Sequence, residues 1–261
     1  MIRLQRDGVV YYRFETLASV SLVQGIFTRL GGVSQGPFAS LNVGHTVGDD
    51  PASVEANLER IYRTLGVKAQ KVTTARQVHG DWVELVTAMD GGRTFPETDA
   101  LITGAPGLAL LLRFADCVPV LFYAPRQRAV GLALAGWQGT VKKIAQKTAL
   151  EMMQAYGCAP DELLVGLGPA IGTCCFEAGP EVVEALRATH PRTEELLSRV
   201  QPDGKAHVDL VQANVQQLAE VGVDRVELAG MCTSCLRQEF YSHRAEGGRT
   251  GRFAVVIGLR G

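Results

Sequence analysis

The sequence has little excess charge and no long apolar run. Its 261 residues carry 26 Lys and Arg against 27 Asp and Glu, a net charge of −1. This balance excludes the strongly basic surface that binds nucleic acid or anionic lipid. No window holds the roughly 18 apolar residues of a membrane span, and the N-terminal MIRLQRDGVVYYRF lacks the apolar centre of a signal peptide. We therefore expect a cytoplasmic protein that has either a small-molecule substrate or no ligand, and no nucleic-acid or membrane partner.

Cysteine is also scarce, which excludes a disulfide-stapled scaffold. The six cysteines are Cys117, Cys158, Cys174, Cys175, Cys232 and Cys235. Cys232 and Cys235 form a CxxC motif. Without a second pair nearby in sequence, such a motif is weak evidence for zinc. We interpret both as ordinary thiols near the end of a strand.

Internal repeats, low-complexity tracts and linkers are absent, so we expect a single domain over residues 1–261. Two β-rich runs lie in 9–28, and VTTARQVHG and WVELVT are expected to be strands on either side of a Gly-Asp turn. Apolar runs of the kind found in strands buried on both faces follow in LALLLRF, VPVLFYA and AVGLALAGW, and shorter strands are expected in LLVGLG, RVELAG and RFAVVIGL. The positions and spacing of apolar residues favour helices at 51–66, 139–157, 180–189, 193–200 and 208–222. The alternation of these elements indicates a mixed α/β fold.

Several polar residues stand where they could form a site. His79 lies at a strand–turn junction, and Asp116 with Cys117 joins two runs that should be buried, where a charge is costly unless it is paired or functional. Pro119, just beyond, argues against a simple central strand there. GWQGT at 136–140 lies at a strand-to-helix junction whose free N–H groups could face an anion. Arg244, Arg249 and Arg252 are spread over a glycine-rich loop that suits a phosphate or carboxylate.

The order of motifs is more specific than any of these features alone. TRLGGVSQGPFASLN, VGDD, QVHG, TDALIT, ADCVPVL, AGWQGTV, GPAIGTCCFE, CTSC and YSHRAEGGRTGR follow one another from residue 28 to residue 252. In this order they resemble the laccase-domain (YfiH-like) family of purine nucleoside phosphorylases, formerly called multicopper polyphenol oxidoreductases. The resemblance runs from about residue 10 to the C-terminus.

The resemblance implies a four-layer α-β-β-α sandwich of mixed sheets with a single site. It implies phosphorolysis of adenosine, inosine and methylthioadenosine, with purine nucleoside and phosphate as partners and adenosine deamination as a side activity. Zinc is the implied cofactor, copper was reported for the family, and a role in peptidoglycan precursor editing is attached to bacterial members. Site residues carried over are His79 and Cys117 as metal ligands and catalytic residues, and Arg29, Asn42, Arg244 and Arg249 as substrate-binding residues. His79 and Cys117 should then lie close together, and Arg244 and Arg249 should line or border the same cleft.

One ligand of the family is missing. The family's second histidine opens an HAGWRG motif, but this chain reads LAGWQG, so Leu134 replaces the histidine and Gln138 replaces the arginine. A catalytic zinc needs about three protein ligands and one open position, so we expect the site to bind zinc poorly. Alternation along the strand should turn Leu132 and Leu134 to one face and Ala133 and Ala135 to the other.

Three functions remain open from the sequence. The first is an active phosphorylase whose metal site is completed by another residue, with His243 and His45 available. The second is a non-catalytic relative that retains the pocket. The third is a metal-free, hydrolase-like use of Cys117 as a nucleophile with His79 as its base.

Overall fold

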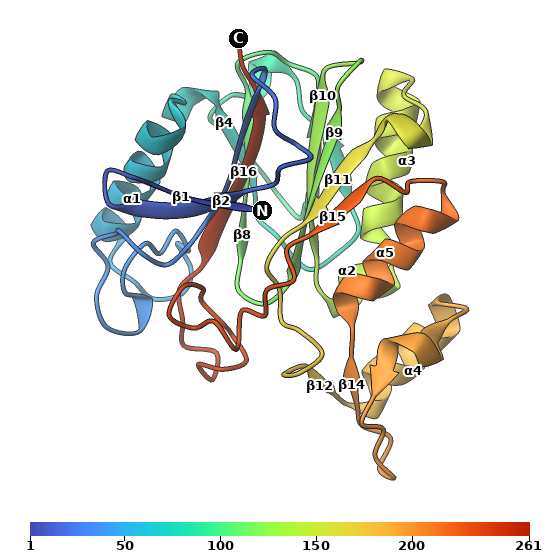
Figure 1. Ribbon diagram of the computed structural model, residues 1–261. Helices are drawn as coiled ribbons and strands as arrows, with labels where there is room; N and C mark the ends of the chain where they lie inside the picture. The colour runs from blue at the N-terminus through green and yellow to red at the C-terminus, as the bar shows by residue number, and fades with distance from the viewer.

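Two mixed β-sheets, stacked face to face, form the centre of the computed structural model, which describes residues 1–261 (Figure 1). The seven-stranded sheet runs in the order β1 (Ile2–Arg6), β2 (Val9–Arg13), β3 (Leu22–Phe27), β16 (Phe253–Leu259), β8 (Ala109–Phe114), β4 (Val72–Ala75) and β6 (Thr94–Phe95). The six-stranded sheet runs β15 (Val226–Leu228), β11 (Leu164–Leu167), β9 (Val118–Ala124), β10 (Ala129–Ala135), β7 (Ala100–Thr103) and β5 (Val83–Leu85). A small third sheet joins β12 (Glu177–Ala178), β14 (Ala206–Val208) and β13 (Leu197–Ser198).

Helices cover the outer faces of the two large sheets. Helix α1 (Pro51–Leu65) packs on the seven-stranded sheet, and α3 (Ile144–Tyr156) with α5 (Leu210–Glu220) packs on the six-stranded sheet (Figure 1). The shorter helices are α2 (Trp137–Val141) and α4 (Pro180–Thr189), and 3₁₀ turns occur at Gly36–Phe38, Ala69–Lys71, Ala88–Asp90, Pro160–Glu162 and Thr193–Leu196. The expected four-layer α-β-β-α sandwich is confirmed. None of the helices has both the length and the apolar character that crossing a bilayer requires.

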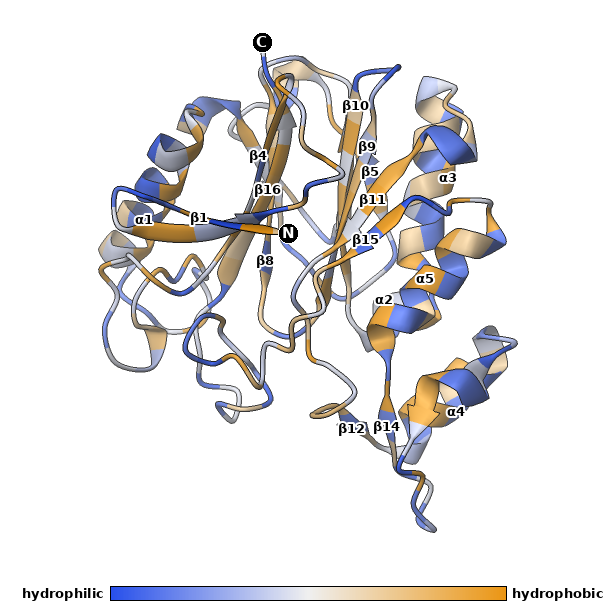
Figure 2. Ribbon diagram, viewed as in Figure 1, coloured by the Kyte–Doolittle hydropathy of each residue, from blue (hydrophilic) through white to orange (hydrophobic).

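Each interface between layers has its own apolar core, which explains the continuous hydrophobic runs. In β8, Leu110 and Leu112 face the opposite sheet, whereas Leu111 between them faces α1. In β10, Leu132 and Leu134 face the seven-stranded sheet and the alternate alanines face α3. Figure 2 shows the central strands coloured mainly as hydrophobic, while the helices also carry hydrophilic residues. Strands buried on both faces need apolar side chains at successive positions, as the sequence shows.

Helix α1 follows the local signals closely. Asp50 caps it by accepting a hydrogen bond from the Ser53 N–H at 3.0 Å, Pro51 occupies its first turn, and Gly66 ends it with φ of +70°. Asp50 and Gly66 pair backbone groups that the helix ends would leave free, and Pro51 has no N–H that would need a partner. Asp209 caps α5 in the same way, through the Gln212 N–H.

Three local expectations were wrong. The helix over 139–157 is split into α2 and α3, because Lys143 adopts a left-handed φ of +63° between them. Residues 193–200 form one 3₁₀ turn and then β13, because Leu197 and Ser198 pair with β14. Pro119 does lie in a central strand, opposite Leu134. Gly168, one residue past the end of β11, lies opposite Pro119 and donates its N–H to the Pro119 backbone oxygen at 2.8 Å, so this pair gives up only the return bond that proline cannot donate.

Candidate active site

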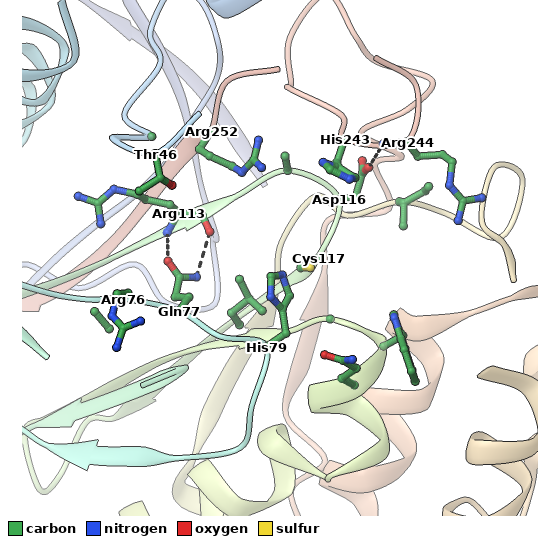
Figure 3. A pocket seen from close by; sticks show the side chains of 18 of the residues that line it. Thr46, Arg76, Gln77, His79, Arg113, Asp116, Cys117, His243, Arg244 and Arg252 are labelled. Carbon is green, nitrogen blue, oxygen red and sulfur yellow. Dashed lines mark hydrogen bonds between the residues drawn. The ribbon is translucent and has the colours of Figure 1, made fainter. Parts of the chain in front are cut away.

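A cavity of about 890 Å³ opens at one end of the sandwich (Figure 3). Strands β4, β8, β10 and β11 end there, and β9 and β16 begin there, so loops from both sheets and from the C-terminal region line it. Its lining includes His45, Arg76, His79, Arg113, Asp116, Cys117, Leu134, Gly136, Trp137, Gln138, Ile171, Phe176, His243, Arg244 and Arg252. Five of the motifs that carried the family resemblance therefore contribute residues to one pocket: QVHG, ADCVPVL, AGWQGTV, GPAIGTCCFE and YSHRAEGGRTGR.

His79 lies in the turn where the chain crosses from β4 of one sheet to β5 of the other. Its backbone has a left-handed φ of +59°, unusual for a residue with a side chain. The buried Asp99 carboxylate holds this turn, accepting the His79 N–H at 2.9 Å, the Gly80 N–H at 2.8 Å and the Val78 N–H at 3.1 Å. Asp99 was missed as a site residue from sequence. The available signal was a charged residue placed directly before a buried strand in TDALIT.

Asp116 and Cys117 make the second crossing between the sheets, from β8 to β9. Asp116 has φ of +86°, and its carboxylate accepts the Thr233 hydroxyl at 2.6 Å and the Arg244 N–H at 2.7 Å. Its backbone oxygen accepts the Ile171 N–H at 2.9 Å. The expectation that a charge between buried strands must be paired is confirmed. Asp116 ties three separate loops of the pocket together.

His79, Cys117 and Leu134 meet around Gly136. A Cβ at Gly136 would lie 2.9 Å from the Cys117 Sγ, 3.2 Å from the His79 Cδ2 and 3.8 Å from the Leu134 Cδ2. The Cys117 Sγ and the His79 Cδ2 both lie within 3.2 Å of the same point. The thiol and the imidazole ring are therefore close together, as expected. Figure 3 shows the His79 ring standing beside Cys117. Glycine at 136 leaves open the space that the three side chains share.

Leu134 occupies the third position with an apolar side chain that is only 3% exposed. It lies in the core between the sheets together with Leu132, while Ala133 and Ala135 lie in the core beneath α3, as the strand alternation predicts. Leucine has no lone pair to donate, and no third ligand atom of a His, Cys, Asp or Glu clusters with those of His79 and Cys117. The pocket residues therefore do not fit the three-ligand zinc that the resemblance implies.

Burial, with a smaller contribution from the nearby Asp116 carboxylate, raises the pKa of the Cys117 thiol to about 12, against an opposing effect of Arg252. A thiol with that pKa stays protonated near neutral pH. Because the thiolate is the reactive form of cysteine, metal-free Cys117 is a poor nucleophile. This finding weighs against the hydrolase-like function.

The arginines of the C-terminal loop divide into pocket and surface residues. Arg244 lines the pocket, with its guanidinium 5.2 Å from the Phe176 ring and an Nη1 that donates to the Glu177 backbone oxygen at 2.8 Å. Arg249, which was expected to line or border the cleft, is exposed and is not among the lining residues. Arg252 lines the pocket instead. The glycine-rich spacing alone did not reveal which arginine turns inward.

Arg29 and Asn42, expected to bind substrate, do not line the pocket. The Arg29 guanidinium donates to the Ala39 backbone oxygen and to the Glu246 carboxylate, both at 2.9 Å. The buried Asn42 amide accepts the Gly44 and Arg252 N–H groups at 2.9 and 2.8 Å. Their positions support a role in holding the loops that carry pocket residues, rather than direct contact with substrate.

Two other histidines reach the pocket. His243 and His45 both line it, and His45 also contacts the Glu55 carboxylate at 2.8 Å. In Figure 3, His243 lies next to Asp116 and near Cys117. His190 and His207 lie elsewhere, the first buried beside α5 and the second bonded to the Thr173 backbone oxygen.

The CxxC motif is not isolated in space. The Sγ atoms of Cys174, Cys175, Cys232 and Cys235 all lie within 4.8 Å of one another, and we call these four residues the cysteine cluster. They are the one group of three or more potential ligand residues of this kind in the structure. Cys232 and Cys235 therefore do have a second cysteine pair beside them, which their position in the sequence did not indicate. The second pair comes from the GPAIGTCCFE loop.

Comparisons with known proteins agree with the architecture. The sequence profile of the family described as multi-copper polyphenol oxidoreductase laccase matches residues 23–260. The purine nucleoside phosphorylase YlmD of Geobacillus stearothermophilus is 40% identical over 247 residues, covering 91% of this chain and 90% of that protein. The purine nucleoside phosphorylase of Deinococcus radiodurans is 40% identical over 232 residues, covering 89% and 87%.

Solved structures match over almost the whole chain. The crystal structure of YlmD from Geobacillus stearothermophilus superposes with a TM-score of 0.93 at 37% identity, covering 100% of this chain and 99% of that one. The YfiH protein of Bacillus licheniformis gives 0.92 at 33% identity, covering 99% and 98%. With a shared fold, a profile match over most of its length and relatives named as phosphorylases, this chain belongs to the multi-copper polyphenol oxidoreductase laccase family, of which YlmD and YfiH are members.

Proposed function

We propose that this protein is a purine nucleoside phosphorylase acting on nucleosides such as inosine, adenosine and methylthioadenosine. The observation that carries the proposal is the charge of the pocket. Four arginines line it, Arg76, Arg113, Arg244 and Arg252, against the single carboxylate of Asp116, whose two oxygens are already hydrogen-bonded. Such a cavity favours an anionic substrate. Because the relatives are named as phosphorylases, we take that anion to be phosphate.

Among these arginines, Arg252 is the best candidate to hold phosphate. Its Nη1 donates to the Thr250 and Gly251 backbone oxygens at 3.0 and 2.9 Å, which fixes the guanidinium and leaves Nε and Nη2 for a ligand. Arg113 is instead held by the Val43 backbone oxygen and the Thr74 hydroxyl, at 2.7 and 2.8 Å. A planar guanidinium with two free donors suits bidentate binding of a phosphate.

The other side of the pocket suits a purine. Trp137 and Phe176 line it together with Ile171, so a flat, mostly apolar base has aromatic faces to stack on. Arg244 lies against the Phe176 ring and extends this surface. A ribose between the two regions would place its C1′ within reach of the phosphate.

Phosphorolysis would then proceed by attack of a phosphate oxygen on C1′ as the N-glycosidic bond breaks, with the bonding electrons passing to the purine. The arginines hold the nucleophile and offset its charge. His79, fixed by Asp99 through its backbone, is the candidate to transfer a proton to the leaving base. Deamination needs an activated water instead, and the two-residue donor set does not fit that requirement, so we assign this chain the phosphorylase activity alone.

The proposed setting is the cytoplasm. All six cysteines are free in the structure, which agrees with a reducing compartment. Purine nucleosides and inorganic phosphate are both available there to such an enzyme.

The test is phosphate-dependent release of hypoxanthine from inosine, measured by chromatography. Arg252→Met should lower kcat/KM by about a hundredfold, equivalent to about 2.7 kcal/mol, while Arg252→Lys should retain part of the activity. The matched control is Arg249→Met, in the same loop but exposed and outside the pocket, which should stay within about twofold of the parent. Equal losses in both methionine variants, with folding intact, would contradict the assigned phosphate site.

A non-catalytic nucleoside-binding protein is the second candidate, favoured by Leu134 and Gln138 at positions where the family has histidine and arginine. Calorimetry separates the two functions. Inosine binding without phosphate-dependent base release would support the binding protein and reject the enzyme.

A further inference from the structure

The cysteine cluster is assembled by the topology of the six-stranded sheet. Strands β11 and β15 are parallel neighbours, so the segments that follow them leave the sheet at the same edge. The pairing continues past both strands, since the Thr233 N–H donates to the Ala170 backbone oxygen at 3.0 Å. Each segment then turns, which brings Cys174 and Cys175 against Cys232 and Cys235.

The sulfur geometry fits a single tetrahedral ion. Zinc–thiolate bonds of 2.3 Å in a tetrahedron place sulfur atoms about 3.8 Å apart. The Cys235 Sγ lies 3.5 Å from both the Cys174 Sγ and the Cys175 Sγ, and all four sulfurs lie within 4.8 Å. The Gly172 N–H donates to the Cys232 Sγ at 3.2 Å, as outer-shell donors do around metal-bound thiolates.

We propose that the cysteine cluster binds one Zn²⁺ through four thiolates and that this ion fixes one wall of the pocket. Binding forms four Zn–S bonds, and the four thiols release their protons to water. With all four ligands supplied by protein, the ion has no open position and acts as a structural zinc. The site is separate from His79 and Cys117, so the inference does not depend on the proposed phosphorylase activity.

Other uses of four cysteines fit less well. A disulfide requires about 2.05 Å between two sulfurs, yet Cys235 has two partners at equal distance and none closer. Iron–sulfur clusters spread their four thiolates over several irons, which needs wider spacing than this compact group provides. Cys174 and Cys235 are exposed, so an ion can enter from solvent without unfolding the core.

The pocket wall depends on the two segments that the ion would join. One carries Ile171 and Phe176, which line the pocket. The other carries Thr233, whose hydroxyl holds Asp116. By joining the two segments, the ion would fix Phe176 and Asp116 relative to each other, although none of its ligands lines the cavity.

Metal analysis of the full chain, purified without added metal, tests the proposal. The parent should carry one zinc per chain, Cys174→Ser and Cys235→Ser should lose it, and Cys158→Ser, at a buried cysteine outside the cluster, should keep it. Because Cys174 and Cys235 are exposed, these serines remove little packing, and circular dichroism checks their fold. Chelation should lower the melting temperature of the parent by on the order of 10 °C, and should leave the two cluster variants unchanged.

Two further measurements locate and identify the ion. Cys117→Ser should retain the zinc, which separates the cluster from the pocket. Co²⁺ loaded into the chelated parent should give the intense thiolate charge-transfer absorption of a four-sulfur site, absent in Cys235→Ser. A metal-free parent, iron in place of zinc, a native disulfide found by mass spectrometry, or zinc lost from Cys117→Ser but retained in the cluster variants would each overturn the proposal.

Discussion

Two sulfur-containing sites lie at the same end of this sandwich, and they are equipped for different tasks. The pocket offers His79 and Cys117, with the apolar Leu134 filling the third position. The cysteine cluster offers four thiols within 4.8 Å. The family resemblance pointed to the pocket as the metal site, yet the complete ligand set is in the cluster. The zinc content of the whole protein therefore says nothing about the pocket unless the two sites are separated by mutation.

Hydrogen bonds connect the two sites. Thr233, between the cysteines of the CxxC motif, donates to Asp116, and Asp116 precedes Cys117 at the floor of the pocket. A change in one site can thus reach the other through a single carboxylate.

The largest effect is expected when the pocket alone is disturbed through Asp99. Asp99→Asn replaces one acceptor oxygen by an NH₂ group that faces backbone N–H groups of the His79 turn, and it removes the buried charge. We expect a loss of about 3 kcal/mol in the free energy of unfolding, with the zinc of the cluster retained. Urea denaturation and metal analysis measure both.

The control for Asp99→Asn is Asp81→Asn, which removes a partly exposed ion pair with Lys147 beside the same turn. It should cost no more than about 1 kcal/mol. Equal destabilisation by the two substitutions would mean that the Asp99 hydrogen bonds do not hold the turn.

The second prediction converts the pocket toward the family pattern. Leu134→His with Gln138→Arg should add a second zinc per chain and raise phosphorolysis at least about tenfold, about 1.4 kcal/mol in transition-state stabilisation. Without metal the buried imidazole lacks a partner, so the chelated variant should melt below the parent. Gln138→Arg alone supplies the control, with no extra zinc. If the parent holds zinc at the pocket and the double variant gains none, Leu134 does not limit the site.

The sequence predicted the parts of this protein whose signals are local. Leu110 to Leu112 indicated a strand buried on both faces, and Asp50 with Gly66 marks the two ends of α1. The motifs of the family indicated the sandwich, and they placed His79 beside Cys117. In each case the structure could be predicted from residues that are close in sequence, or from motifs shared with the family.

What the sequence did not reveal depends on contacts between distant segments. The cluster requires that β11 and β15 be parallel neighbours, and no spacing within CTSC or GPAIGTCCFE states that. Likewise Arg249 and Arg252 stand in one glycine-rich loop, and only the path of the backbone decides which one enters the pocket. The strands of the third sheet are two or three residues long, too short for any periodic pattern.

The third prediction tests the connection between the sites. Thr233→Val keeps the shape of a fully buried side chain but leaves one Asp116 oxygen without its donor. We expect a loss of about 1–2 kcal/mol in stability, unchanged zinc content and a raised KM for phosphate. Removing zinc from Thr233→Val should then lower activity less than removing it from the parent, because the shared connection is already broken. Fully additive effects would show that the sites act independently.

The smallest effect is a loss of stability at low pH. Acid also releases zinc by protonating the thiolates, so the effect of His190 must be measured on protein from which zinc has been removed. His190 is buried, and burial lowers its pKa below the usual value; the nearby Lys143 ammonium adds to this. The Gln217 amide lies 2.7 Å from its Nε2, so a protonated ring would place an N–H against that donor. A depressed pKa means that the unfolded chain binds the proton first, so the stability contributed by neutral His190 is present above about pH 6.5 and is lost as the pH falls. Glutamine at this position cannot titrate. As the pH falls from 7.5 to 5.5, the chelated His190→Gln variant should therefore lose less free energy of unfolding than the chelated parent. Chemical denaturation of both chelated proteins at the two pH values measures the difference in their free energies of unfolding. If that difference is the same at both pH values, His190 does not contribute to the loss of stability in acid.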